Sequence, residues 1–145
     1  MAPMIFAKAI MEGTPIDVFN YGDMKRDFTY IDGIVESVVR VSEKIPAADP
    51  EFDTANSNPS CSNVPYRLYN IGNHQPIELM SFIETLERIL DRAGKTNLRQ
   101  MQLGDVIEIY ANTEDLRTEV SFARDTSLEA GLQCFIGWFQ RYFRK

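Results

Sequence analysis

Apolar residues recur at helical spacing in four segments of the chain, and short strand-like stretches lie between these segments. The clearest segment follows Pro76, a residue that suits the first turn of a helix, and its apolar stripe is Leu79, Ile83, Leu86, Leu90 and Ala93. Another stripe runs from Leu128 to Phe143 and follows a capping-box sequence at residues 126–129. These patterns predict helices over about 76–93 and 128–143.

Two further helices are predicted nearer the start of the chain. Residues 3–12 have helical spacing and end at Gly13, a residue that favours the left-handed conformation after a helix. This helix begins almost at residue 1, which is typical of a chain cut from a longer one. Residues 32–45 carry β-branched residues that favour a strand, but the apolar positions 34, 38, 41 and 45 share one helical face. We therefore expect a helix there, with Asp32 as its N-cap.

The remaining apolar stretches are short and favour strands. They are residues 16–19, 26–31, 66–71 and 98–103. Residues 46–65 hold four of the seven prolines, so we expect a surface loop there. The order of elements predicts an α/β domain (α+β when isolated) with a small sheet of three or four short strands and packed helices. So small a sheet cannot cover every apolar helix face, and some of these faces are expected to pack against another domain.

Composition limits the functions that this chain can have. Its 145 residues fit one domain, and a net charge of −6 disfavours nucleic acid as a partner, although a single arginine can still bind a small anion. No apolar run approaches the roughly 18–20 residues that span a bilayer, and no secretion signal is apparent, so we expect no membrane and a cytoplasmic location. Two cysteines and one histidine are too few for a structural zinc site.

The sequence contains no recognisable catalytic set. No glycine-rich phosphate loop follows a strand, and the single histidine, His74, would have to serve every acid or base step. Tyr21 and Lys25 have the Tyr-x-x-x-Lys spacing of a base and its cationic partner. That spacing works on a helix, whereas Gly22 and Asp23 predict a turn between them. We therefore assign no catalytic, cofactor-binding or metal-binding residue.

Three stretches, in this order, carry a family resemblance. They are GDMKRDFTYID at residues 22–32, YNIGN at 69–73 and QLGDV at 102–106, and the final WFQRYF at 138–143 adds to them. Together they resemble the C-terminal half of extended short-chain dehydrogenases/reductases that act on nucleotide sugars, most of all the UDP-glucuronate 4-epimerases. The resemblance covers nearly the whole chain. It implies that residues 1–145 are a substrate-binding C-terminal region and that the Rossmann domain lies outside them.

The resemblance implies a polar contact set for the ligand. Arg26 would bind the diphosphate or ribose, and its guanidinium fork suits phosphate oxygens better than an ammonium does. Gln102 and Asp105 would lie near the ribose and base, where a carboxylate can accept ribose hydroxyl groups. Gly104 would permit the sharp turn that orients Asp105.

The resemblance also implies apolar contacts to the uracil. Val18 and Phe19, at the end of a strand, match positions that pack against the base, and Ile77 matches another apolar position of the same pocket. A flat base needs such a surface. Core packing explains the same three residues equally well, so both interpretations stay open here.

In the family, a tyrosine of the N-terminal half removes a proton from the sugar C4 hydroxyl while hydride passes to NAD⁺, and the 4-keto sugar then takes the hydride back on its other face. The resemblance thus implies the UDP-sugar-binding part of an NAD-dependent nucleotide-sugar epimerase, interconverting UDP-glucuronate and UDP-galacturonate in the intact enzyme. We expect no NAD on this chain, no activity from it alone, and partners that include the missing Rossmann domain and a homodimer through apolar helix faces. The alternatives are a part of a nucleotide-sugar dehydratase or reductase, and a stand-alone nucleotide-sugar-binding or interaction module.

Overall fold

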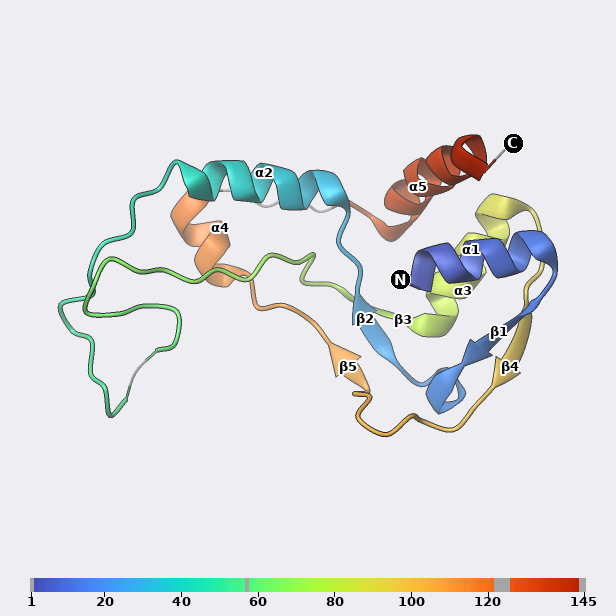
Figure 1. The fold of residues 1–145 in the computed structure, drawn as a ribbon, viewed down its shortest axis with the longest axis horizontal. Coiled ribbons are helices and arrows are strands. Elements are labelled where there is room, and N and C mark those ends of the chain that lie inside the picture. The colour runs from blue at the N-terminus through green and yellow to red at the C-terminus, as the bar shows by residue number, and fades with distance from the viewer. Residues whose placement is uncertain (1, 57, 122–125, 144–145) are drawn as a thin grey trace. The chain divides into compact units, whose positions relative to one another are not determined.

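The structure, a computed structural model, describes residues 2–56, 58–121 and 126–143 (Figure 1). The chain forms two compact units, and each is built from separate stretches of sequence. Unit 1 comprises residues 1–28, 75–110 and 126–145, and unit 2 comprises residues 29–74 and 111–125. No helix in the described ranges is both long and apolar enough to cross a membrane.

Unit 1 contains the strands and three of the helices. Its helices are α1 (Ala2–Glu12), α3 (Leu79–Leu90) and α5 (Leu128–Phe143). Its strands are β1 (Pro15–Val18), β2 (Lys25–Asp27), β3 (Pro76–Glu78), β4 (Lys95–Leu98) and β5 (Glu108–Ile109), and a 3-10 turn, η1, spans Phe19–Gly22. These strands form two small sheets rather than one.

The two sheets of unit 1 have different topologies. In the first, β1 pairs in parallel with β4, so that Ile16 lies opposite Thr96. In the second, β2 is the central strand, antiparallel to β3 and parallel to β5. Arg26, at the middle of β2, therefore lies opposite Ile77 on β3 and Ile109 on β5.

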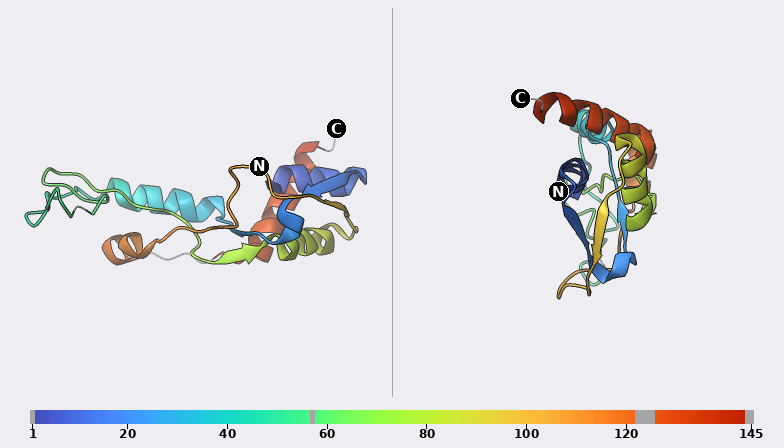
Figure 2. Two further views of the ribbon diagram at one scale, coloured as in Figure 1. Left: turned by 90° about the horizontal axis from the view of Figure 1, so that it is seen from below. Right: turned by 90° about the vertical axis from the view of Figure 1, so that its right-hand side faces the viewer.

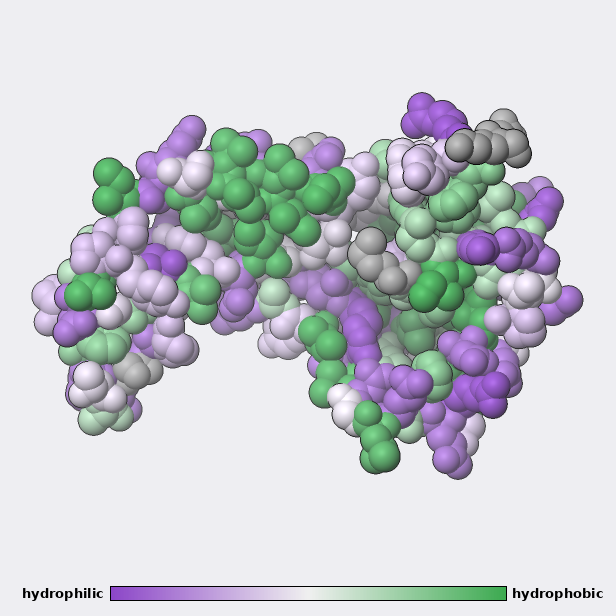
Figure 3. Space-filling view, in the orientation of Figure 1, coloured by the Kyte–Doolittle hydropathy of each residue, from purple (hydrophilic) through white to green (hydrophobic). Residues whose placement is uncertain are grey.

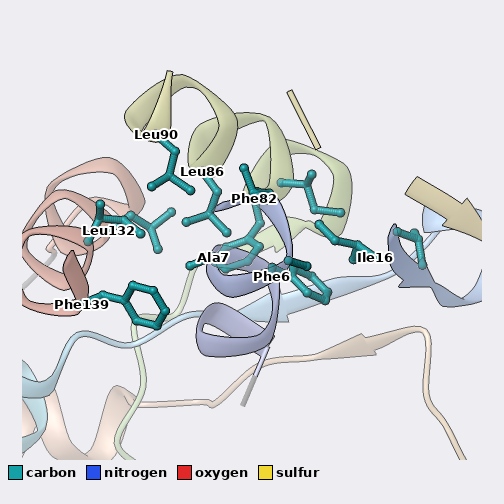
Figure 4. Packing of buried hydrophobic residues seen from close by; sticks show 13 residues of the cluster. Phe6, Ala7, Ile16, Phe82, Leu86, Leu90, Leu132 and Phe139 are labelled. Atoms are coloured by element: carbon teal, nitrogen blue, oxygen red, sulfur yellow. The ribbon is translucent and has the colours of Figure 1, made fainter. Parts of the chain in front are cut away.

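The hydrophobic core of unit 1 lies where α1 and α5 pack against α3 and where α1 covers β1 (Figures 2 and 4). Phe82, Ile83 and Leu86 on α3 are almost completely buried, as are Ile16 and Val18 on β1. The other buried side chains of this core are Leu90 on α3, Phe6, Ala7, Ala9 and Ile10 on α1, and Leu132, Ile136 and Phe139 on α5. The period-3.6 patterns of the sequence thus mark the faces that form this core.

Unit 2 consists of two helices and a long irregular segment. Helix α2 (Ile31–Ser42) packs against α4 (Glu114–Val120). Within residues 43–74, the described part has one isolated bridge, between Cys61 and Arg67, and no helix or longer strand. Arg67 connects this segment to α4 through ion pairs with Asp115, at 3.4 Å, and with Glu119.

The predicted fold class, a small α/β arrangement, is confirmed, but several element bounds were wrong. Residues 66–71 form no strand beyond the single bridge at Arg67. The predicted strand 98–103 lies earlier, at Lys95–Leu98, because it is set by pairing with β1. The short strand β5 was not predicted. Strand 26–31 stops at Asp27, and Pro76 begins a strand that pairs with β2 instead of the helix.

The helix ends also differ in detail from the sequence prediction. Tyr30, rather than Asp32, is the N-cap of α2, and Asp32 lies in the first turn. Helix α3 ends at Leu90 because Asp91 takes the left-handed conformation, with φ 50°, three residues before Gly94. At α5 the Ser127 hydroxyl accepts the Ala130 N–H at 3.3 Å, so Glu129 pairs instead with Arg88 on α3.

Candidate functional site

Arg26 is fixed by backbone carbonyls from two strands. Its Nη1 donates to the Lys25 carbonyl at 2.8 Å and to the Ile107 carbonyl at 3.1 Å. The Ile107 carbonyl also accepts the Lys25 N–H at 2.8 Å, where β5 joins β2. The Arg26 side chain is 24% exposed, so its guanidinium is held in place but can still be reached from solvent.

Asp105 lies beside this guanidinium. Its Oδ1 is 3.6 Å from Arg26 Nη2, and its side chain is 34% exposed. The turn that presents Asp105 closes with a hydrogen bond from its N–H to the Gln102 carbonyl at 3.2 Å. Gly104 has φ 88°, a left-handed conformation that favours glycine. The structure therefore places Arg26, Asp105 and the backbone of Gln102 in one region of unit 1, with the Gln102 side chain exposed.

The three predicted apolar contacts differ in their environment. Val18 is fully buried in the core of unit 1, the environment that core packing predicts. Phe19 and Ile77 are partly exposed. Ile77 lies directly opposite Arg26 in the β2–β3 pairing, so it is the apolar candidate that the register places beside the arginine.

Sequence reasoning missed several parts of this region. The carbonyl of Ile107 positions Arg26, but a backbone acceptor leaves no signal in the sequence. The η1 turn was predicted only as a turn, whereas Asn20 and Tyr21 both have positive φ, 48° and 52°. The Tyr21 N–H donates to the Arg99 carbonyl at 3.0 Å, which connects this turn to the segment that leads to Gln102. Lys25 lies on β2, so Tyr21 and Lys25 do not share a helix.

This arrangement suits anion binding rather than bond making or breaking. Arg26 Nη1 has both of its N–H groups committed, whereas Nη2 has only a 4.0 Å contact with the Met24 sulfur and the 3.6 Å approach of Asp105. Nη2 can therefore donate to an incoming phosphate oxygen. Within the described ranges, no group of three or more His, Cys, Asp or Glu side chains could hold a metal ion.

The described residues do not fit a dinucleotide. Such a cofactor needs a glycine-rich turn between a strand and the N-terminus of the next helix. The three strand-to-helix connections here are residues 28–30, the direct junction of β3 with α3, and residues 110–113, and none contains glycine. We therefore assign no step of chemistry on this chain to such a cofactor.

Two side chains of unit 2, Tyr69 and Glu119, have shifted pKa values with a shared structural cause. The Tyr69 hydroxyl donates to Glu119 at 2.5 Å, and this hydrogen bond, with the nearby Arg67, lowers the pKa of Glu119. Burial, together with the same hydrogen bond, raises the pKa of Tyr69. The guanidinium of Arg67 also lies over the Tyr69 ring, 5.7 Å from its centroid. These contacts attach residues 60–69 to α4.

Comparison with known proteins gives one consistent result. No protein-family model matches the sequence. An uncharacterized 37.6 kDa protein of Escherichia coli O111:H- is 43% identical over 144 residues, which are 99% of this chain and 43% of that protein. A probable UDP-glucuronate 4-epimerase of Rhizobium meliloti is 38% identical over 146 residues, covering all of this chain and 43% of the relative. The chain thus spans less than half the length of these relatives.

A solved structure agrees with the fold described above. The UDP-glucuronic acid 4-epimerase of Bacillus cereus, crystallised with UDP-glucuronic acid and NAD, matches with a TM-score of 0.79 and 22% identity. The match covers 99% of this chain and 40% of that one. At this identity the likeness establishes the fold alone.

Proposed function

Because this chain belongs to the nucleotide-sugar epimerases of the extended short-chain dehydrogenase/reductase family and corresponds to their C-terminal part, we propose that it binds the nucleotide of a UDP-sugar. In the intact protein the reaction would interconvert UDP-glucuronate and UDP-galacturonate, with NAD held by a Rossmann domain outside these residues. The observation that carries the proposal is Arg26, a guanidinium fixed by two carbonyls with Nη2 left for an anion.

Each proposed contact has a physical reason. Arg26 would bind the diphosphate, because a guanidinium offers charge-assisted hydrogen bonds to phosphate oxygens. Asp105 would accept ribose hydroxyl groups, and the exposed Gln102 side chain could reach the ribose or base from the same turn. Ile77 and Phe19 would pack against the uracil, while buried Val18 would support them from the core.

The bond changes of the proposed reaction need groups that the described residues do not supply. No strand-to-helix connection here fits the cofactor, and the Tyr21–Lys25 pair is not arranged as a base and its partner. This region would contribute binding energy at the UDP, away from the reacting sugar carbon, and so orient the substrate. The absence of turnover by this chain alone stays a prediction, checked by incubating it with NAD⁺ and UDP-glucuronate.

The binding proposal can be tested by replacing Arg26 with lysine, a change that keeps the charge but removes the fork. We expect Arg26→Lys to weaken UDP binding by about tenfold, since a lysine ammonium cannot reproduce the planar guanidinium that is anchored through Nη1 while Nη2 donates to the phosphate. Titration of the ¹⁵N-labelled chain with UDP, followed by NMR, measures dissociation constants even in the weak range expected here. The resonances that shift should include those of residues 26, 77 and 102–105.

Arg92→Lys is the matched control. Arg92 is also in unit 1, and its guanidinium donates to the Met11 carbonyl at 2.8 Å, on α1. This variant should bind UDP as the unsubstituted chain does. Equal UDP affinity of the Arg26→Lys and Arg92→Lys chains would remove Arg26 from the binding site and would defeat the proposal.

A further inference from the structure

We propose that Asp105 is a specificity-determining residue. When no nucleotide is bound, its carboxylate lies beside the Arg26 guanidinium and disfavours the binding of bare phosphate anions there. A ligand that carries both a diphosphate and a ribose diol displaces the carboxylate from Arg26 and gives it new hydrogen-bond donors. This inference rests on the proposed function, because it concerns the same ligand.

The position of Arg26 does not depend on Asp105. Both N–H groups of Nη1 are used by the carbonyls of Lys25, at 2.8 Å, and Ile107, at 3.1 Å. The Ile107 carbonyl is itself fixed by the Lys25 N–H in the β2–β5 pairing. Removing the charge of Asp105 would therefore change the electrostatic environment of the guanidinium while its backbone anchors remain.

The contact between Asp105 and Arg26 is a loose one. Charge-assisted hydrogen bonds between N⁺–H and O⁻ are typically about 2.7–2.9 Å long, whereas Oδ1 of Asp105 lies 3.6 Å from Nη2. Both side chains are partly exposed, at 24% and 34%, so water screens their attraction. A phosphate oxygen that reaches hydrogen-bonding distance from Nη2 can therefore replace the carboxylate.

Displacement has a different outcome for different ligands. Inorganic pyrophosphate would bring negative charge toward Arg26 against the repulsion of Asp105, and it has no ribose diol to donate to the carboxylate. A nucleoside diphosphate meets the same repulsion but also carries two ribose hydroxyls that can donate to the carboxylate. The exposed turn 102–105 can move without disturbing the core, because it carries no buried side chain. Asp105 would thus favour the nucleotide over the bare anion.

The test compares three probes on the whole chain: pyrophosphate, UDP and 2′,3′-dideoxy-UDP. In Asp105→Asn, which keeps the size of the side chain and the backbone turn, pyrophosphate should bind about three- to tenfold more tightly, because a repulsive charge a few ångströms away has been removed. UDP should gain less or should weaken. The preference of the unsubstituted chain for UDP over the dideoxy compound should largely disappear.

Glu84→Gln is the control for net charge. Glu84 is an exposed carboxylate on α3 that forms no ion pair within the described ranges, so its substitution should leave all three affinities unchanged. If pyrophosphate binds Asp105→Asn no more tightly than it binds Glu84→Gln, or binds neither variant, the inference is wrong. Loss of UDP binding in Arg26→Lys in that same experiment would leave the proposed function standing, so the two failures can be told apart.

Discussion

At the scale of single residues, two glycines with nearly the same positive φ lie in different surroundings. Gly22 has φ 89° and Gly104 has φ 88°. A Cβ added at Gly22 would lie 2.9 Å from both Cγ and Sδ of Met80, whereas a Cβ added at Gly104 would meet nothing within 4 Å. Gly104 thus needs glycine only for its backbone conformation, whereas Gly22 needs it both for its conformation and because a larger side chain would clash with Met80.

We expect Gly104→Ala to lower the free energy of unfolding by about 1 kcal/mol, the usual cost of a left-handed conformation in a residue with a Cβ. Gly22→Ala should lower it by roughly 1 kcal/mol more, because the Met80 side chain must move. Urea unfolding monitored by circular dichroism measures both values. A second substitution, Met80→Ala, should reduce the difference between the two glycine variants, and equal costs in all backgrounds would contradict this account.

At the scale of elements, the sequence predicted helices better than strands. Helices α1, α3 and α5 have long apolar stripes that contact the core, so their periodicity survives in the structure. The strands have at most four residues, and their bounds are set by distant partners. Lys95–Leu98 is largely polar and yet pairs with β1, while residues 66–71, which are richer in aromatic and aliphatic side chains, pair with no strand beyond the bridge at Arg67.

The candidate site shows the same limit. Arg26, Gln102 and Asp105 were identified because their residue types match a family pattern. In the structure, Nη2 of Arg26 and Oδ1 of Asp105 lie 3.6 Å apart. The acceptor that fixes Arg26 is a carbonyl on β5, a strand that the sequence did not predict. The burial of Val18 depends on how α1 covers β1, and no local pattern distinguishes it from the partly exposed Phe19.

The contact between α4 and residues 60–69 should depend on pH. The pKa of Glu119 is lowered below its usual 4.5 by the hydrogen bond from Tyr69 and by Arg67, so the charged form stabilises the folded state. This contribution is fully present above about pH 4.5 and is lost as the pH falls through the lower pKa of the folded chain. We expect Glu119→Gln to lose stability at neutral pH and to show a weaker decline on acidification.

Thermal unfolding measured at a series of pH values checks this expectation. The control is Glu114→Gln, an exposed carboxylate in the first turn of the same helix that makes no contact with Tyr69 or Arg67. That variant should keep the acid dependence of the unsubstituted chain. If Glu119→Gln and Glu114→Gln decline in parallel, the Tyr69–Glu119 hydrogen bond does not contribute to stability.

At the scale of the whole molecule, the largest uncovered apolar feature in view belongs to α2 (Figure 3). Ile31, Val35, Val38 and Val39 are each about half exposed, while the opposite side of the helix buries Gly33 and Ser37. Apolar patches of this kind mark surfaces that associate with other proteins. In the intact protein we propose that this face of α2 contacts the Rossmann domain.

When that domain is absent, we expect the chain to associate with itself through α2. The double variant Val35→Lys/Val39→Glu places opposite charges one helical turn apart and should shift sedimentation toward the monomer, without loss of helical content. Tyr142→Lys, on the exposed side of α5, is the matched control and should leave association unchanged. A monomeric unsubstituted chain at high concentration would rule out the α2 contact.

The interleaving of the two units also affects how the chain can be synthesised. Unit 1 is assembled from three stretches of sequence, and α5 adds Leu132, Ile136 and Phe139 to a core that already includes Phe6 and Phe82. On the ribosome, α1 and α3 emerge long before α5, and the part of the core that α5 covers stays exposed throughout that interval. A nascent chain that stalls before Leu132 would therefore expose a hydrophobic surface that chaperones can bind, because only α5 covers it in the folded protein.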